Sequence, residues 1–370
     1  MEGEILNFIK VWISVLVSLC FCYSIRNVVP KGTKRLLSVL PVVCLFLYLP
    51  LKISSVHLGG STAFFIAWLA NFKVLLFAFG KGPLSSDPSI SLPLFIALAC
   101  LPIKIQQKGQ SKENPAPRRG KEGLRNYAVK GVLLAMLIRA YDYSDYIHPN
   151  VILIMYSFHV YFLLEILLAV GAVLARNFLG LELEPQFNEP YLATSLQDFW
   201  GCRWNLVVTS ILRPTVYEPT RAIGSHLIGR KWAPLPAVFA TFVVSAIMHE
   251  IIFYYLGRVR PNWEISWFFL LHGFCLTVEI ALKKVLNDRW RLPKMISTML
   301  TVGFVMSTGF WLFFPKFVEY KVDVRAFEEY AEIGAYMKNE GLKWSREETS
   351  DLGVVFCLPF DKLITFLSSS

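Results

Sequence analysis

The sequence predicts an all-α, polytopic membrane protein with about eight transmembrane helices, and its composition and hydropathy both support this class. Apolar residues make up 55% of the 370 residues and charged residues only 17%, against about 25% in ordinary soluble domains. The mean hydropathy is +0.48, and long apolar runs recur along the chain. The same composition excludes a disordered chain, a disulfide-stapled secreted scaffold and a collagen-like fibre, because each needs a bias that is absent here.

Eight apolar runs are long enough to cross a bilayer, whose hydrocarbon core requires about 20 residues of helix. In chain order, these predicted spans are residues 6–25, 36–51, 61–80, 127–143, 151–176, 234–256, 264–282 and 295–315. Two shorter runs are weaker candidates, since 89–103 is interrupted by prolines and 352–367 has an Asp-Lys pair at its middle.

The distribution of Lys and Arg predicts the orientation of these spans, because cytoplasmic loops next to membrane segments collect basic residues. Residues 26–35 carry four basic residues, and residues 104–125 carry seven basic residues against two acidic ones. Both loops are therefore predicted to be cytoplasmic, which makes the intervening run 89–103 re-entrant or surface-lying. The same reasoning places 177–233 and the turn 283–294 in the cytoplasm and the N-terminus in the lumen.

We predict one integral membrane domain over residues 1–370, with three distinctive segments. Residues 104–125 form a basic, flexible cytoplasmic loop that is rich in Gly, Pro and Gln. Residues 177–233 form a cytoplasmic or interfacial segment with an aromatic motif. Residues 316–370 form a C-terminal segment to which the sequence assigns no role.

The net charge of +10 and the pI of about 9.2 do not predict a nucleic-acid partner. The basic residues lie between apolar runs and not along one soluble face, so membrane topology explains them. The seven cysteines contain no CxxC pair and lie mostly in apolar runs, where Cys acts as a small hydrophobe. We therefore expect neither a disulfide framework nor a metal site.

An ionisable pair interrupts the apolar run 234–256, where His249 and Glu250 are adjacent. An ionisable side chain at membrane depth costs about 2 to 3 kcal/mol, which an interhelical hydrogen bond of about 0.6 kcal/mol would not offset. A functional role is therefore favoured over a purely structural one. A neutral imidazole is a general base, so His249 is the candidate for chemistry. Adjacent positions on a helix point about 100° apart, so we expect Glu250 to act in support from another face.

A second concentration of polar and aromatic residues precedes this helix, in YLATSLQDFWGCRWN at 191–205. Trp200, Arg203 and Trp204 fit either an aromatic belt with a snorkelling Arg or a substrate-binding surface. Asn205 is harder to explain as a belt residue, because its amide offers both a donor and an acceptor. Such an amide can orient a substrate carbonyl or an imidazole.

Further polar residues extend the candidate site in both directions. Arg213 and Arg221 follow the aromatic segment, and their guanidinium groups can bind a phosphorylated ligand or a lipid headgroup. His272 and Glu279 lie seven residues apart in the run 264–282, and therefore nearly on one helical face. We expect them to line a polar strip that contacts substrate.

Three motifs occur in a fixed order: EPYLATSLQDFWGCRWN at 189–205, SAIMHE at 245–250, and FFLLHG at 268–273 followed by Glu279. They resemble, in turn, the aromatic block ending in Trp-Asn, the helix with the catalytic His, and the wax-synthase continuation of the membrane-bound O-acyltransferase family. Within that family, the sequence looks like the plant wax synthases, the long-chain-alcohol O-fatty-acyltransferases. The resemblance covers most of the chain but not residues 316–370.

The resemblance implies transfer of a long-chain acyl group from acyl-CoA to a fatty alcohol, which gives a wax ester and CoA. It places His249 at the catalytic position as general base and Asn205 at the second one. It implies a multi-pass protein of the endoplasmic reticulum whose partners are acyl-CoA, a lipid hydroxyl and the bilayer. No cofactor is expected, because the thioester donor is already activated. Cys202, where many relatives have Arg, and the Ala-Ile pair at 246–247, where Gly-Leu is commoner, weaken any statement about the acceptor.

Two alternatives stay open. The same chemistry can act on a sterol or a diacylglycerol, and the motifs do not distinguish these acceptors. A more remote alternative is a transporter that uses its intramembrane His and Glu residues, although the sequence has no inverted repeat and no paired broken helices. The sequence indicates neither acyl chain-length preference nor oligomeric state.

Overall fold

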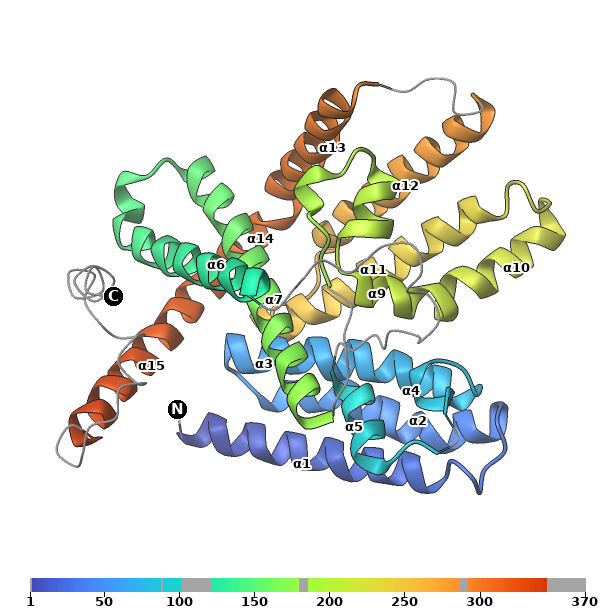
Figure 1. Ribbon diagram of the computed structural model, residues 1–370, viewed down its shortest axis with the longest axis horizontal. Helices are drawn as coiled ribbons and strands as arrows, with labels where there is room; N and C mark the ends of the chain where they lie inside the picture. The colour runs from blue at the N-terminus through green and yellow to red at the C-terminus, as the bar shows by residue number, and fades with distance from the viewer. Residues whose placement is uncertain (1, 88, 102–120, 180–185, 287–291, 345–370) are drawn as a thin grey trace.

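The computed structural model describes residues 2–87, 89–101, 121–179, 186–286 and 292–344. Over these ranges every regular element is helical and no strand is present, which confirms the all-α prediction (Figure 1). The weak candidate run 352–367 and most of the predicted loop 104–125 lie outside the described residues.

Seven helices or continuous helical runs of the described chain are long and apolar enough to span a membrane. They are α1 (Glu2–Ser24); α2 (Thr33–Tyr48) with a 3-10 turn (Leu49–Lys52); α3 (Val56–Thr62), a π-helical run (Ala63–Ala70) and α4 (Asn71–Ala78); α7 (Pro149–Leu179); α11 (Pro234–Gly257); α12 (Glu264–Val285); and α13 (Lys294–Thr308), a π-helical turn (Gly309–Phe313) and α14 (Pro315–Glu319). Each coincides with one of the eight predicted spans, which confirms a polytopic membrane protein.

The eighth predicted span, 127–143, falls on α6 (Lys121–Ala140), which is helical but does not qualify as a span. Lys130 and Arg139 lie within 127–143 and Arg125 precedes it, so every 18-residue window of α6 holds at least three charged residues. One of them, Lys130, forms an ion pair with Glu165 of α7, the helix against which α6 packs. A span at 127–143 is therefore not confirmed, because a helix that pairs with a neighbour can carry as many apolar residues as one that faces lipid.

Helix α5 (Leu92–Cys100) is too short to cross the bilayer, in agreement with the prediction for 89–103. Its 9 residues extend about 14 Å at about 1.5 Å per residue, less than half of a hydrocarbon core of about 30 Å. Lys73 of α4 is buried and donates from Nζ to the carbonyl oxygens of Leu98 and Leu101, both at 2.7 Å. These bonds satisfy carbonyl groups at the end of α5 and hold it against the bundle.

The continuous run Val56–Ala78 lies at the centre of the bundle, with 72% of its apolar window buried. On one side it shares an apolar core with α1, α2 and α5, which includes Phe46 and Phe95. On the other side Ala63 packs against Tyr255 of α11. Small residues at this contact allow close approach of the two backbones. The central run therefore links the N-terminal helices to α11, which carries His249.

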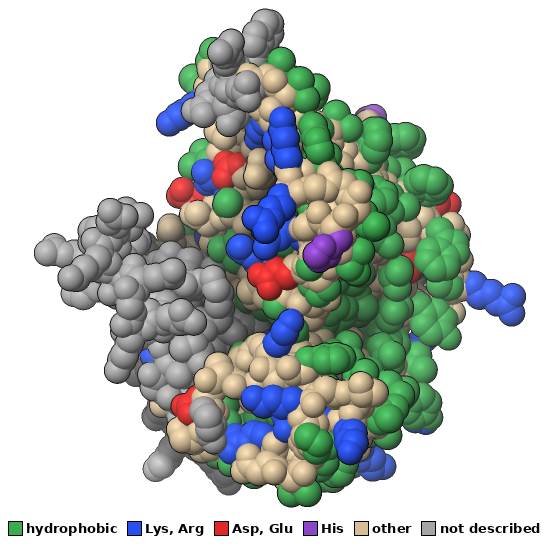
Figure 2. Space-filling view, turned by 90° about the vertical axis from the view of Figure 1, so that its right-hand side faces the viewer, with side chains coloured by type: hydrophobic (Ala, Val, Ile, Leu, Met, Phe, Trp, Pro, Cys, Tyr) green, Lys and Arg blue, Asp and Glu red, His purple; other side chains and the backbone are tan. Residues whose placement is uncertain are grey.

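The loops that join the helices lie at two opposite ends of the bundle. One of these ends is rich in Lys and Arg and is called the basic end. At this basic end, the amide of Gly32 donates to the carbonyl of Ala78 at 2.8 Å, and Lys284 donates to the carbonyl of Lys231 at 2.6 Å. Helix α10 (Glu218–Leu227) lies at the same end. Figure 2 views this end and shows Lys and Arg side chains that form a band across it. The band agrees with the cytoplasmic orientation predicted from the loop charges.

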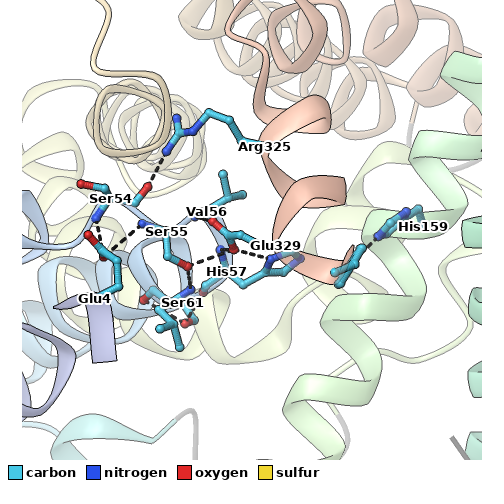
Figure 3. A network of polar contacts seen from close by, with 11 residues as sticks. Glu4, Ser54, Ser55, Val56, His57, Ser61, His159, Arg325 and Glu329 are labelled. Carbon is cyan, nitrogen blue, oxygen red and sulfur yellow. Dashed lines mark hydrogen bonds and ion pairs between the residues drawn. The ribbon is translucent and has the colours of Figure 1, made fainter. Parts of the chain in front are cut away.

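The opposite end is held together by α15 (Val322–Trp344), which belongs to the C-terminal segment 316–370. Its Glu329 contacts the start of the central run (Figure 3). The carboxylate accepts from Ser55 Oγ at 2.9 Å and from the amide of His57 at 3.1 Å, and lies 2.7 Å from His57 Nδ1. Arg325 of α15 donates to the carbonyl of Leu256, at the end of α11. The C-terminal segment therefore has a structural role that the sequence did not assign.

Candidate active site

The imidazole of His249 has one fixed tautomer. Its Nδ1 lies 2.7 Å from the carbonyl oxygen of Ser245, one turn earlier in α11. Because a carbonyl oxygen can only accept, Nδ1 carries the hydrogen and Nε2 carries the lone pair. Among the described residues no group hydrogen-bonds Nε2, and the side chain is half-buried. The ring can therefore accept a proton through Nε2, as a general base must.

Aromatic side chains from three other helical runs surround this ring. Phe269 of α12 stacks on it with ring centroids 3.9 Å apart and planes inclined by 26°. Trp68 of the central run meets it edge-on at 5.0 Å, and Phe313 lies 6.1 Å away. Three walls of the site are therefore apolar, and the stacking fixes the direction in which Nε2 points. Neither Trp68 nor Phe313 was predicted from the sequence.

Asn205 also has one free polar group. It follows a π-helical turn (Phe199–Arg203) and adopts a left-handed backbone with φ 41°, a conformation that Asn tolerates better than most residues. Its Oδ1 accepts from the amide of Val208 at 3.4 Å and caps α9 (Leu206–Leu212). Within the described chain its Nδ2 has no hydrogen-bond partner, so the amide retains a donor for a substrate oxygen.

Trp200 links the Asn205 segment to the surroundings of His249. Its backbone carbonyl accepts from Thr209 Oγ1 at 3.3 Å, and its ring lies 6.4 Å from that of Phe269, which stacks on His249. No direct contact between Asn205 and His249 occurs among the described residues. Trp200 and Phe269 therefore form a chain of contacts between the Asn205 segment and His249, and the catalytic pairing of Asn205 with His249 stays a prediction.

His272 has no free nitrogen in the described structure. Its Nδ1 accepts from the indole N–H of Trp200 at 3.1 Å, so its hydrogen is on Nε2, which donates to Thr308 Oγ1 at 2.8 Å. The Thr308 hydroxyl in turn donates to the carbonyl of Phe304 at 2.7 Å. With 0% of His272 exposed, the ring joins the aromatic segment, α12 and α13.

Glu279 anchors the same segment two turns further along α12. Its carboxylate accepts from the amides of Leu196 at 2.8 Å and Gln197 at 3.3 Å, and pairs with Lys283 at 2.8 Å. His272 and Glu279 therefore share one face of α12, as predicted, whereas a contact of this face with substrate stays a prediction. This face holds the aromatic segment, residues 191–205, at two places. His272 binds the indole of Trp200, and Glu279 binds the amides of Leu196 and Gln197.

Arg203 and Trp204 pack within their own segment. Arg203 pairs with Asp198 at 2.8 Å and donates to the carbonyl of Glu189 at 3.2 Å, which closes the loop. Trp204 stacks on Phe199 with centroids 5.6 Å apart and planes inclined by 13°. These contacts shape the loop from which Asn205 projects.

Arg213 and Arg221 lie on the surface near the basic end. The Arg213 side chain is 71% exposed and approaches Glu218 at 3.7 Å. Arg221 is exposed and lies 6.0 Å from the ring centroid of Tyr217. Both guanidinium groups have donors available for an anion.

Glu250 faces a different neighbour from His249, as expected for adjacent helical positions. Its Oε1 accepts from the amide and the hydroxyl of Ser266, both at 3.1 Å, and the residue is 3% exposed. This pair of bonds joins α11 to the first turn of α12 and supports the helix that carries His249.

Comparisons with known proteins show the family to which the chain belongs. Residues 183–271 match the model of the membrane bound O-acyl transferase family. The chain is 54% identical to acyl-CoA–sterol O-acyltransferase 1 of Arabidopsis thaliana, over 89% of this chain and 96% of that protein. It is 46% identical to the long-chain-alcohol O-fatty-acyltransferase of Simmondsia chinensis, over 92% of this chain and 97% of that protein. With identity at this level over nearly the whole length, the chain belongs to the membrane-bound O-acyltransferase family.

Proposed function

We propose that the protein transfers a long-chain acyl group from acyl-CoA to a fatty alcohol and releases a wax ester and CoA. The observation that carries this proposal is the tautomer of His249, whose Nδ1–H is bound to Ser245 while Nε2 is free to accept a proton. The relative from Simmondsia chinensis, whose name describes acyl transfer to a long-chain alcohol, supports the same reaction.

In the proposed reaction, His249 Nε2 takes the hydroxyl proton of the alcohol as its oxygen attacks the thioester carbonyl. The carbon–sulfur bond then breaks, and the imidazolium returns the proton to the departing thiolate, which leaves as CoA. A positioned general base contributes about 10² to 10⁴ in rate. The donor thioester is already activated, so the reaction requires neither a covalent enzyme intermediate nor a cofactor.

Asn205 has a separate proposed role. Its Oδ1 is occupied by the amide of Val208, whereas Nδ2 is available to donate to the thioester oxygen as negative charge develops there. Asn205 is therefore a helix cap through Oδ1 and a proposed oxyanion donor through Nδ2.

The solubilities of the substrates suggest how they reach the site. The nucleotide of acyl-CoA belongs in water, so we place it at the basic end near Arg213 and Arg221, while both alkyl chains belong in hydrocarbon. The ester product remains dissolved in the bilayer. A multi-pass protein of the endoplasmic reticulum fits this route, and that localisation is part of the proposal.

A sterol acceptor is the second candidate, because the relative that is 54% identical is named for acyl transfer to sterols. One experiment separates the candidates. Microsomes from a host that lacks neutral-lipid synthesis are supplied with acyl-CoA together with octadecanol, a sterol or a diacylglycerol, with His249→Ala as the control. Octadecyl ester as the main product supports the first proposal, sterol ester supports the second, and no ester with any acceptor overturns both.

A further inference from the structure

A crevice on the outer side of α11 contains a buried carboxylate. Its volume is about 240 Å³, and it is lined by Ile247, Glu250, Ile251, Tyr254, Pro261 and Trp263. It lies between the second half of α11 and the loop that leads to α12. Its surface is almost entirely apolar apart from Glu250, the residue that follows His249 in the chain.

The carboxylate of Glu250 uses only one of its oxygens. Oε1 accepts both hydrogen bonds from Ser266, whereas no group in the described ranges donates to Oε2. Glu250 is 3% exposed, so Oε2 has little access to water. A carboxylate oxygen without a donor in such surroundings is unfavourable. A ligand hydroxyl in the crevice would supply the missing donor.

The crevice opens on the side of α11 that is not covered by other helices. Ile247 is 45% exposed and Trp263 is 55% exposed, on or next to a helix that is apolar enough to span a membrane. The volume is below the range of about 300 to 1,000 Å³ that encloses a whole drug-sized ligand. It therefore suits the polar end and the first carbons of a lipid whose remaining chain stays in the bilayer.

Trp263 is held in the wall of the crevice by a strained backbone. Its φ is 66°, in the left-handed region, where a bulky residue is strained. The neighbouring Asn262 stabilises this turn, since its side chain donates to Glu264 Oε1 at 3.0 Å and accepts from the Glu264 amide at 3.3 Å. Strain of this kind persists where the surrounding structure specifies the position of one side chain, here a large apolar wall.

We propose that this crevice is the docking site of the acceptor lipid, which donates its hydroxyl hydrogen to Glu250 Oε2. The first carbons of the acceptor pack against Ile247, Ile251 and Trp263. Glu250 then offsets the cost of carrying a hydroxyl into the hydrocarbon region. His249 lies one residue earlier on α11 but points about 100° away from Glu250, so the acceptor leaves this crevice before it reacts. This inference rests on the proposed acyl transfer to a lipid hydroxyl, and it names the position that the acceptor occupies before reaction.

Two substitutions test the site in the full-length protein reconstituted in lipid nanodiscs. Glu250→Gln keeps a side-chain carbonyl for Ser266 but replaces the other oxygen with an amide that cannot accept. Ile247→Trp fills the crevice from a position that is already exposed, so the fold tolerates it. Leu282→Trp, at a 54% exposed position of α12, is the matched control. With octadecanol as acceptor, we expect KM for the alcohol to rise about tenfold in both test variants, with KM for acyl-CoA and the control unchanged. An unchanged alcohol KM in Ile247→Trp, or an equal rise in both KM values, would overturn the proposal.

A binding measurement separates this proposal from the reaction itself. Octadecanol that carries a diazirine near its hydroxyl is photolysed with the inactive variant His249→Ala, and the labelled peptides are identified. Labelling of residues 247–263 that free octadecanol competes away, and that Ile247→Trp abolishes, supports the docking site even if wild-type turnover is absent. Labelling that Ile247→Trp leaves intact would refute the docking site even where ester formation by the wild type stands.

Discussion

The indole N–H of Trp200 donates to Nδ1 of His272 at 3.1 Å, and this bond fastens the aromatic segment to the buried face of α12. Because His272 also donates to Thr308, replacing the ring removes a partner from two other groups at once. We expect His272→Leu to lower the free energy of unfolding by about 1 to 3 kcal/mol.

A double-mutant cycle isolates the Trp200–His272 bond within that loss. Trp200→Phe removes the indole donor but keeps an aromatic ring, and the double variant is compared with both single variants by thermal unfolding in detergent. We expect a coupling of about 1 kcal/mol. Additive effects of the two substitutions would show that the bond does not stabilise the fold.

Asn205 combines two roles that one substitution separates. Asn205→Asp keeps a side-chain oxygen to cap α9 but loses the amide donor, so the melting temperature should change little. If Nδ2 stabilises the developing oxyanion, kcat should fall by about 10² to 10³. Ester formation at saturating substrates and thermal unfolding are measured on the same preparation. A normal kcat in this variant would remove Asn205 from the proposed mechanism.

Glu329 makes the stability of the C-terminal contact dependent on pH. Burial by itself would raise the pKa of this carboxyl, but hydrogen bonds from residues 55–57 outweigh burial and lower its pKa below the usual value of 4.5. A lowered pKa in the folded state means that the stabilisation is complete above about pH 4.5 and is lost as the pH falls through the lower folded value.

We therefore expect Glu329→Gln to lower the melting temperature at neutral pH, with a difference from the wild type that shrinks below pH 4.5. Thermal unfolding between pH 3.5 and 7.5 tests this expectation. A difference that stays constant over the whole range would mean that the ionised carboxylate contributes nothing beyond the amide that replaces it.

Arg213 and Arg221 are expected to act on the acyl donor alone. Their replacement by Gln should raise KM for acyl-CoA about three- to tenfold with little change in kcat, because they contact phosphates and not the reacting atoms. The effect should weaken at high salt, where exposed charges are screened. Arg139→Gln is the control, since its side chain is 84% exposed in a different part of the chain. An acyl-CoA KM that neither substitution changes would exclude this surface as the donor site.

The sequence predicted the helical class and most spans because both depend on composition over about 20 residues, which a single chain records directly. It also singled out His249, since an ionisable group within an apolar run is conspicuous. The span that is not confirmed, 127–143, has the same origin. Apolar content alone does not distinguish a helix that packs on α7 through Lys130 and Glu165 from one that faces lipid.

The sequence alone did not predict contacts between segments that lie far apart in the chain. Trp68 lies in a run so uniformly apolar that no position within it stands out, yet it forms one wall around His249. Glu329 lies in a polar segment without a recognisable motif, and only the fold brings it to residues 55–57. For His272 and Glu279 the shared helical face was predicted, but their partner, the aromatic segment, became known only from the structure.

The most direct test of the account is the rate of ester formation by His249→Ala and His249→Gln, reconstituted beside the wild type at saturating acyl-CoA and octadecanol. Both variants should insert, and His249→Gln should melt close to the wild type, because His249 hydrogen-bonds only to its own helix among the described residues. His249→Ala also loses the stacking on Phe269 and should be the less stable of the two. We expect kcat to fall by about 10² to 10⁴ in each variant. Turnover within about twofold of the wild type would contradict the assignment of this imidazole as the general base.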